Sequence, residues 1–435
     1  MAAVLFLLLN PLTRRMAEPM IGSPIKYDLK RSAIPLVNSN ESDVLVIGGG
    51  ICGVATAFHL AQLGQWVTVL ERGEIASEAS GVNAGGLGGL GWGNNPDLQS
   101  YLTAGSFEIF KTLQLDMGYD IEFMAPGGLQ GIHTAEQWDW VRGRVHNYQM
   151  QGYHAELLTS RETRAMEPEA SESLPGFMYL SKRGKANPTK ATMAFSDATA
   201  ALGAIIKTGH NVEGMTQQQD GSWQVQTNQG EFTAKTLVLA VGAWSRPVGD
   251  MLGVEIPIAP IKGQMWATAP VPPSIFHLSG SMESAFDWSQ QSPNNNFPPE
   301  ITHHGDTRVT RHLYGGQSRN GEIIFGGDRQ LVGYDYTPDA TGIEVNRGHA
   351  SEIIPLVGKL PIVRTWAGIM PFSMDGKPII GKIPQFDNLF VLTGLASSGF
   401  GRGPMSGKLL ADYIHTGHPA PVLSEADPAR CVIFK

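Results

Sequence analysis

The sequence predicts an α/β protein, α+β overall, in which a domain built on a parallel sheet is interrupted by a second group of strands. Three observations support this fold class. A glycine-rich turn joins an apolar strand to a helix between Val46 and Gly64. Two further buried strands, "TLVLAVG" and "DNLFVLTG", follow much later in the chain. Between these two lies a second group of strands, from about Gly253 to Arg364, with a different character.

The first elements form a strand, turn, helix and strand in close succession. The strand "DVLVI" leads into a turn whose glycines Gly48, Gly50 and Gly53 fit G-x-G-x-x-G. The run "GVATAFHLAQLG" has helical spacing and ends at Gly64. A second strand, "QWVTVLER", ends in Glu71, close to the interval of about 20 residues at which an acidic residue meets a ribose hydroxyl. An ordinary glycine turn is the competing interpretation, but the complete order predicts a dinucleotide pyrophosphate at the helix N-terminus.

The next segment, from Ala76 to Gly93, contains too much glycine for a regular helix or strand. It is either a flexible linker or an ordered loop whose backbone lies against a flat ligand, and Asn83 with its apolar neighbours favours the loop. From about Gln99 to Gly184 the pattern turns to helices with polar faces. A capping box predicts that one helix begins at Thr159 to Glu162.

The rest of the chain predicts a return to the first domain. A long helix is expected in "TKATMAFSDATAALGAI", followed by a meander of short strands. The second group of strands includes "IKGQMWAT", "RVTRHLYGG" and "EIIFGGDRQ", and encloses a proline- and asparagine-rich stretch, Val271 to Ile301, that predicts a long surface insertion. The glycine loop "LASSGFGRGP" then precedes a helix, "MSGKLLADYIHTG". Two helix N-termini, one near each end of the chain, are therefore expected to face one ligand.

Composition narrows the function classes. The net charge of -8 argues against nucleic acid as a partner, because no basic stripe is present to neutralise phosphates. Two cysteines, Cys52 and Cys431, provide neither a disulfide framework nor a metal cluster, so we predict no metal site. His303 and His304 adjoin the proline-rich stretch and are expected in a surface loop, not as metal ligands.

The amino-terminal run "MAAVLFLLLN" is too short to span a bilayer, and its positive charges follow the apolar residues, unlike those of a secretory signal. A transit peptide, a membrane-touching tail, or sequence upstream of a start at Met16 or Met20 all fit this pattern. We expect residues 1–42 to form a disordered extension, with peripheral membrane contact through it as the less favoured alternative. The expected location is the cytoplasm or the interior of an organelle, without secretion.

Taken together, the chain resembles the FAD-dependent oxidoreductase family of D-amino-acid oxidase, glycine oxidase and sarcosine oxidase. The resemblance covers nearly the whole chain after Ser42 and rests on "VIGGGICGVATAFHLAQLGQWVTVLER", "SEASGVNAGG", "VLAVGAWS", "PIKGQ", "RTWAGIMPFSMDGKPIIG" and "GLASSGFGRGP". It implies a Rossmann-like FAD-binding domain, discontinuous in sequence at 43–94, 185–255 and 365–425, and an antiparallel-sheet substrate domain at 95–184 and 256–364. No cysteine occupies a recognisable covalent flavin site, so noncovalent FAD is expected.

The resemblance also implies which residues contact FAD. Glu71 would contact the adenosine ribose, the backbone of Val212 would lie beside the adenine, and Gly242 would close a strand end near the dinucleotide. The remaining implied contacts, along the pyrophosphate and the flavin ring, are Gly48, Gly50, Gly53, Arg72, Ser80, Asn83, Ala84, Gly85, Gly86, Gly394, Gly399, Phe400, Gly401 and Arg402.

Family members oxidise a C–N bond by passing a hydride from the carbon beside a neutral amine to the flavin, which leaves an imine that water hydrolyses. The resemblance therefore implies a small-molecule amine or amino-acid substrate, with oxygen or another acceptor taking the electrons. This chain departs from the family at two arginines, one that pairs with the substrate carboxylate and a second in the final glycine loop. Met370, which we include in the predicted catalytic set, stands at one of these positions, and Ser397 falls near the other.

Three arginines are candidate replacements: Arg311, Arg329 and Arg402, each with a surface ion pair as its alternative. Tyr314, in "RHLYGGQ", aligns roughly with a family tyrosine that touches substrate, although it could instead pack within the sheet. The predicted catalytic set is completed by Tyr314, Arg329 and Arg311. Lys262 is either a cation beside the flavin that assists oxygen activation or, the favoured interpretation, a solvated lysine at a strand end.

Two function hypotheses remain from different classes. The first is an FAD-dependent oxidase or dehydrogenase acting on an amine or amino acid. The alternative is an FAD-containing assembly or scaffold protein with little turnover, suggested by Met370, Ser397 and the expected insertion at Val271 to Ile301. An NAD(P)-dependent reductase is disfavoured, because the resemblance includes the flavin loops as well as the dinucleotide turn.

Overall fold

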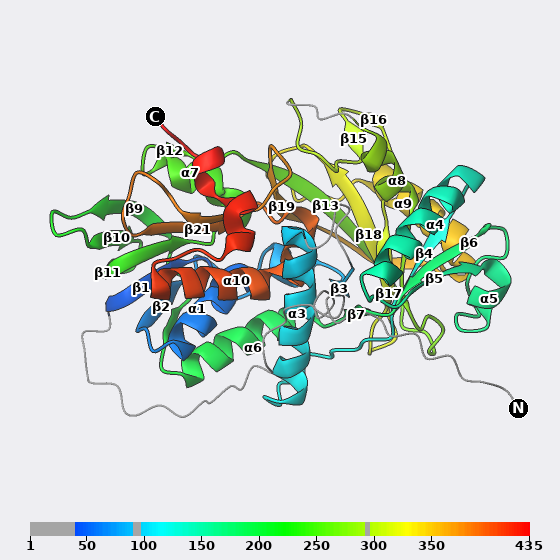
Figure 1. The fold of residues 1–435 in the computed structure, drawn as a ribbon, viewed down its shortest axis with the longest axis horizontal. Helices are drawn as coiled ribbons and strands as arrows, with labels where there is room; N and C mark the ends of the chain where they lie inside the picture. The colour runs from blue at the N-terminus through cyan, green and yellow to red at the C-terminus, as the bar shows by residue number, and fades with distance from the viewer. Residues whose placement is uncertain (1–39, 90–96, 292–295) are drawn as a thin grey trace, which may run out of the picture.

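The computed structural model describes residues 40–89, 97–291 and 296–435. The expected extension at 1–42 therefore falls almost entirely outside the described residues. Within them, two large sheets lie side by side, and helix α3 (Leu98–Leu115) stands between them (Figure 1). No helix in the described ranges is long and apolar enough to cross a membrane.

The first sheet contains the predicted βαβ unit. Its described strands follow the order β20-β21-β11-β1-β2-β8, with β10 and β9 continuing from β11. β1 pairs in parallel with both β2 and β11, as the glycine-turn pattern predicts. β9, β10 and β11 form the predicted antiparallel meander. The strands are β1 (Glu41–Ile47), β2 (Val67–Leu70), β8 (Ile205–Lys207), β9 (Val212–Gln217), β10 (Trp223–Thr227), β11 (Gly230–Leu239), β20 (Ile379–Lys382) and β21 (Leu389–Thr393).

Alternation along β1 divides the core of this sheet into two layers. Val44 and Val46 pack with the helices α1 (Ile51–Gln62) and α10 (Gly399–Thr416), whereas Leu45 and Ile47 pack with the meander on the other face. The two helices approach closely, because a β-carbon at Gly407 would lie 2.7 Å from the backbone nitrogen of Thr56. The long helix expected after Asn187 is α6 (Pro188–Ala201), which also packs against α1.

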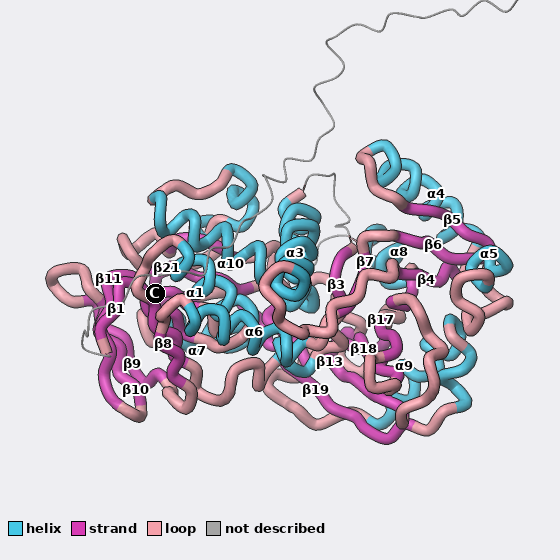
Figure 2. Tube along the Cα trace, turned by 90° about the horizontal axis from the view of Figure 1, so that it is seen from below, coloured by secondary structure: helices cyan, strands magenta, loops and turns pink. Residues whose placement is uncertain are grey.

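The second sheet follows the order β19-β13-β18-β17-β14-β4-β6-β5 among the described strands. It is antiparallel as predicted, except that β14 pairs in parallel with β4. Helices α4 (Ala135–Met150) and α9 (Ala340–Ile353) cover opposite faces of it (Figure 2). The strands are β4 (Gly128–Ile132), β5 (Ala155–Thr159), β6 (Gly176–Leu180), β13 (Ile258–Thr268), β14 (Leu278–Ser281), β17 (Tyr314–Gln317), β18 (Ile323–Gln330) and β19 (Ile362–Ser373).

Short elements complete the described fold. The capping box at Thr159 and Glu162 is confirmed, and it begins helix α5 (Ser160–Arg164). The other short helices are α2 (Ala79–Val82), α7 (Ser245–Asp250) and α8 (Glu283–Gln290), and the two-stranded pairs are β3 (Gly86–Gly88) with β7 (Arg183–Lys185), β12 (Val254–Glu255) with β22 (Ile433–Phe434), and β15 (His303–His304) with β16 (Thr307–Arg308). The β3–β7 pair lies beside α3, between the two large sheets (Figure 2).

Two local predictions were wrong. The stretch from Val271 to Ile301 is no surface insertion, because it contributes buried strand β14 to the middle of the second sheet, followed by α8. The glycine-rich stretch after Ala76 contains a short helix and a short strand, α2 and β3. The expected boundary between residues 364 and 365 falls inside β19, which pairs with β13 along its length. Tertiary pairing supplies regularity that the glycine and proline content did not predict.

Candidate functional site: two adjoining cavities

A long cavity of about 330 Å³ runs from the carboxyl ends of the first sheet's parallel strands toward the second sheet. We call it the glycine cavity, because its lining residues include Gly48, Gly50, Gly242 and Gly399. Ile51, at the start of α1, and Gly399, at the start of α10, both line it. The predicted pair of helix N-termini at one site is thus confirmed, although α10 begins at Gly399 and not after Pro404.

The glycines of the first turn serve different purposes. Gly48 has a φ of +113°, and a β-carbon there would lie 2.4 Å from the carbonyl oxygen of Ala240. A β-carbon at Gly53 would lie 1.9 Å from the carbonyl oxygen of Gly48, so this residue allows α1 to pack against the turn and does not line the cavity. At Gly50, a β-carbon would meet the Ser80 hydroxyl, which accepts a hydrogen bond from the Ile51 backbone nitrogen at 2.9 Å.

Glu71 is fixed at the rim of the turn by two backbone donors. Its Oε2 accepts from the Gly49 nitrogen at 2.6 Å, and its Oε1 accepts from the Gly73 nitrogen at 2.7 Å. The carboxylate is buried and lines the glycine cavity beside Val212. A carboxylate with both oxygens held in this way is oriented in advance for a hydroxyl donor.

Arg72, Glu78 and Trp244 line the outer end of the glycine cavity, and two tyrosines from the loop after β18 pack against these residues. The Arg72 guanidinium lies 3.9 Å from the centre of the Trp244 ring, and Trp244 stacks on Tyr334 with 5.5 Å between ring centres. Tyr334 and Tyr336 belong to the loop after β18, and the Tyr336 hydroxyl donates to Glu78 at 2.6 Å. We call Arg72, Glu78, Trp244, Tyr334 and Tyr336 the aromatic clasp.

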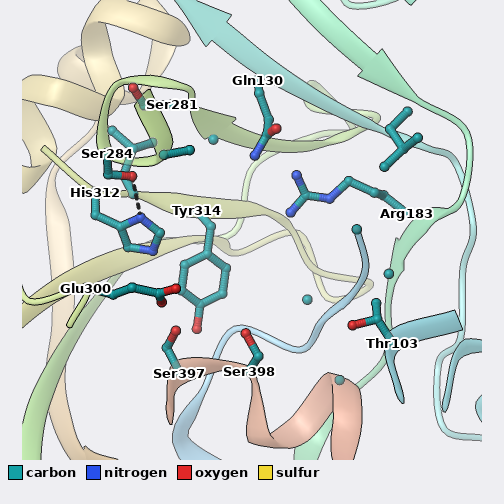
Figure 3. Close-up of a pocket in the computed structure, with 18 of the residues that line it drawn as sticks. Thr103, Gln130, Arg183, Ser281, Ser284, Glu300, His312, Tyr314, Ser397 and Ser398 are labelled. Carbon is teal, nitrogen blue, oxygen red and sulfur yellow. Dashed lines mark hydrogen bonds between the residues drawn. The ribbon is translucent and has the colours of Figure 1, made fainter. Parts of the chain in front are cut away.

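A second cavity, of about 170 Å³, adjoins the inner end of the first and is drawn in Figure 3. We call it the arginine cavity, because Arg183, Arg329 and Arg402 line it. Tyr314 and Ser397 line both cavities and so mark their junction. Burial raises the pKa of Tyr314, while a hydrogen bond from the Ala84 backbone and the charge of Arg329 act in the opposite direction.

Arg329 is buried at this junction and has a partner on every side. Its Nη2 donates to Ser397 Oγ at 2.6 Å and lies 3.0 Å from His312 Nε2. Its Nη1 donates to the Glu300 carbonyl oxygen at 2.7 Å, and its guanidinium lies over the Trp288 ring. Since a guanidinium only donates, His312 Nε2 must accept from it, and His312 Nδ1 carries the proton toward Ser284 Oγ at 2.9 Å. Burial and the charges of Arg329 and Arg183 lower the pKa of His312, which is therefore neutral.

The architecture matches known enzymes over most of the chain. A family model described as "FAD dependent oxidoreductase" matches residues 43–413. Glycine oxidase of Pseudomonas aeruginosa is 29% identical to this chain, over 86% of this chain and 95% of that protein. The crystal structure of glycine oxidase from Geobacillus kaustophilus superposes with a TM-score of 0.76 at 23% identity, over 89% of this chain and 98% of that one. The structure of L-proline dehydrogenase from P. horikoshii has a TM-score of 0.76 at 27% identity, over 90% and 98%.

The chain belongs to this family. It is an FAD-dependent oxidoreductase of the class that oxidises C–N bonds of amines or amino acids, and its cofactor is noncovalently bound FAD. The glycine cavity fits that cofactor. The first turn of α1 has neither a side-chain cap nor an acidic residue, so its N-terminal dipole is open to phosphate. Cys52 lines the cavity, but burial raises the pKa of its thiol to about 12, so it does not supply a thiolate.

The structure separates the predicted FAD residues into three groups. The first lines the glycine cavity: Gly48, Gly50, Glu71, Arg72, Ser80, Asn83, Val212, Gly242, Gly399 and Phe400. Gly86, Gly401 and Arg402 line the arginine cavity instead. The third group lines neither of these two cavities: Gly53, Ala84, Gly85 and Gly394.

The predicted catalytic residues are also divided. Tyr314 and Arg329 meet at the junction, and Met370 lines the glycine cavity. Arg311 is not brought to either cavity: its Nη1 pairs with Glu352 at 3.0 Å, which matches the ion-pair alternative. The favoured interpretation of Lys262 as a solvated residue was wrong, because its amine is buried and donates to Asp335 at 2.9 Å and to the Thr337 carbonyl.

Sequence reasoning missed much of the arginine cavity. His312, Glu300 and Trp288 contact Arg329, and Arg183 enters from β7. His312 lies two residues before Tyr314, so the alternation of side chains along a strand could have placed both on the same face. The other residues come from separate parts of the chain, and no local signal joins them. The paired histidines, expected in a surface loop, form the short strand β15; His304 is exposed, whereas His303 is partly buried beside Asp328. Among the described residues, no group of three or more His, Cys, Asp or Glu side chains is placed to hold a metal ion.

Proposed function

We propose that the enzyme oxidises the C–N bond of a small amino acid whose carboxylate binds at the junction of the two cavities. The observation that carries the proposal is the contact between Arg329 and Ser397. The resemblance implies a family arginine of the final glycine loop near Ser397, and here the guanidinium of Arg329 reaches that position from β18, with 2.6 Å between Nη2 and Oγ. A cation from one strand therefore takes the place of one from the final loop.

Ser397 would make the direct contact with the carboxylate. Its oxygen accepts from Arg329, so its own O–H remains to be donated, and a hydroxyl polarised by a guanidinium is a strong donor to an anion. Arg329 would act behind it as a buried charge that offsets the desolvation of the incoming carboxylate. Its other contacts, to His312 and Glu300, hold the guanidinium in place.

The remaining lining residues would position the amine and exclude water. Met178, Leu180 and Leu313 form apolar walls of the arginine cavity. His312 is neutral, so it adds no positive charge against the substrate nitrogen. Bound FAD would supply the acceptor for the hydride that leaves the carbon beside the neutral amine, and water would hydrolyse the resulting imine. The relatives named as glycine oxidase and L-proline dehydrogenase support an amino-acid substrate, primary or secondary.

Anaerobic mixing of the purified holoenzyme with a panel of amines tests this proposal. The panel contains glycine, sarcosine, L-proline, D-alanine and iminodiacetate, with matched amines that lack a carboxylate. We expect loss of the visible flavin absorbance with one or more of the amino acids and none with the matched amines. Hydrogen peroxide released in air would identify oxygen as the electron acceptor, and its absence would indicate another acceptor. Absorbance that no amine changes would contradict the proposal and favour a scaffold role.

A further inference from the structure

Two of the three cavity arginines, Arg183 and Arg402, form no ion pair with a carboxylate among the described residues, whereas Arg329 pairs with Glu300. Of these two, Arg402 lies in the field of Glu300 and Asp97, and Arg183 is the one on which no described carboxylate acts. It extends from β7, where it pairs with Gly88 of β3, and its side chain crosses Gly128. A β-carbon at Gly128 would lie 2.7 Å from Arg183 Cδ, so this glycine leaves the path into the cavity open. Nε of Arg183 is fully buried and has no hydrogen-bond partner within the part of the chain that the structure describes.

Such a group is expensive in a folded protein. Arg183 is half-buried, and its shielded, unbonded Nε loses hydration that nothing in the described residues replaces. Burial accordingly lowers the pKa of Arg183 to about 10. In Figure 3 its guanidinium points into the cavity, and the amide of Gln130 points toward the same space. A fixed cation and an amide donor, facing one volume from different strands, form a site for an anionic oxygen pair.

The charge balance of the arginine cavity points the same way. Arg183, Arg329 and Arg402 line it against a single lining carboxylate, Glu300, and His312 is neutral, so the lining carries a net charge of about +2. Arg329 pairs with Glu300, with 3.5 Å between Nη1 and Oε2. Arg402 is attracted electrostatically by Glu300 and by Asp97, which does not line the cavity, and its Nε donates to the Thr103 hydroxyl. A substrate with one carboxylate would leave Arg183 unmatched.

We infer that the substrate carries a second anionic group, a carboxylate bound by Arg183 with Gln130, so that the substrate class is a small amine with two carboxylates. This inference rests on the proposed function and makes it narrower. One carboxylate occupies the junction at Ser397, the other lies at the Arg183 end, and the amine lies between them beside Tyr314. The cavity volume of about 170 Å³ restricts the molecule to a short amino dicarboxylic acid.

Calorimetric binding of two unreactive thioethers to the holoenzyme tests the inference. Thiodiacetate has two carboxylates and methylthioacetate has one, and neither has an amine to oxidise. We expect thiodiacetate to bind the parent enzyme about 30-fold more tightly. In Arg183→Met the two ligands should bind with about equal affinity. The affinity for methylthioacetate itself should change by less than about threefold. Arg183→Lys should restore part of the preference, and Arg319→Met, at an exposed pair with Asp120, should leave it unchanged.

Thermal unfolding gives a second readout that a structural role for Arg183 would not produce. Without ligand, Arg183→Met should unfold at the same or a higher temperature than the parent, because it removes a half-buried charge that forms no ion pair within the described residues. The inference is overturned if thiodiacetate binds the parent no more tightly than methylthioacetate, or if Arg183→Met weakens both ligands equally. In the amine panel, equal oxidation of sarcosine and iminodiacetate would reject this inference alone, whereas a silent panel would reject the proposed function.

Discussion

The glycine cavity and the arginine cavity adjoin each other but are built in different ways. The glycine cavity is formed largely by backbone and by carboxylate contacts to backbone, as at Gly48 and Glu71. The arginine cavity is formed by charged side chains that meet from β7, β18 and α10. An invariant ligand such as FAD can be recognised by a fixed main-chain shape, whereas substrate choice depends on where a few charges are placed. The first cavity therefore defines the enzyme class, and the second defines its specificity.

The largest expected effect comes from breaking the backbone geometry of the glycine cavity. Gly53→Ala places a β-carbon 1.9 Å from the Gly48 carbonyl oxygen, so α1 must move away from the turn that receives the pyrophosphate. We expect the FAD content to fall more than about tenfold. The melting temperature should also fall, because overpacking of this kind typically destabilises a protein by about 1–3 kcal/mol. Visible absorbance relative to protein absorbance after purification measures the FAD content.

Gly143→Ala is the matched control for this variant, because a β-carbon there meets nothing within 4 Å and the residue lies within helix α4. It should keep full FAD and unfold at a slightly higher temperature. Stoichiometric FAD in Gly53→Ala would contradict the assignment of this turn.

A substitution at Arg329 should separate the two cavities functionally. Arg329→Lys keeps the positive charge but cannot donate to Ser397, His312 and Glu300 together. We expect kcat/KM for the best amino acid to fall by about 100-fold, equivalent to roughly 2.7 kcal/mol, with FAD content unchanged. Steady-state kinetics with parallel absorbance spectra check both parts.

Arg311→Lys is the control for Arg329→Lys, because Arg311 pairs with Glu352 outside both cavities. Its kcat/KM should stay within about twofold of the parent value. If the two lysine variants behave alike, the junction assignment is wrong.

The smallest expected effect concerns two neutral histidines, His59 in helix α1 and His312 in the lining of the arginine cavity. Burial lowers the pKa of His59 in α1 to about 3, and it also lowers the pKa of His312 well below the ordinary value near 6.5. The unfolded chain binds a proton at each residue below about pH 6.5 and the folded chain does not, so the free energy of unfolding falls as pH falls from there toward the folded pKa. His59 should contribute a loss of about 2 kcal/mol at pH 5, and His312 a loss in the same direction.

Melting temperatures at pH 7 and pH 5 measure this effect in the parent, His59→Gln and His312→Gln. Glutamine can replace the contacts of His312, accepting from Arg329 and donating to Ser284. Each variant should therefore show a smaller drop between the two pH values than the parent. An unchanged drop in His312→Gln would show that this residue is not the neutral acceptor inferred from its contacts.

The parts of the fold that could be predicted are those whose sequence signals lie close together in the chain. The strand, turn, helix and acid around Gly48 and Glu71 are close in sequence, and their periodicity was sufficient to predict the parallel sheet. Strand β14 was missed because its four residues, "LSGS", have little β-propensity and become a strand only through pairing with β4 and β17. Arg183 was missed for a related reason, since only the β3–β7 pairing brings it to the cavity.

The aromatic clasp has a kinetic consequence. Trp244 belongs to the half of the molecule that holds the first sheet, while Tyr334 and Tyr336 follow the last residue of β18 in the second. Because the two tyrosines hold the lining residues Trp244 and Glu78, we expect that release of a bound dinucleotide would require the stacked rings to part and the Tyr336–Glu78 hydrogen bond to break. The residence time of the prosthetic group is then governed by the opening of one loop, and dilution alone should strip it from the holoenzyme only slowly.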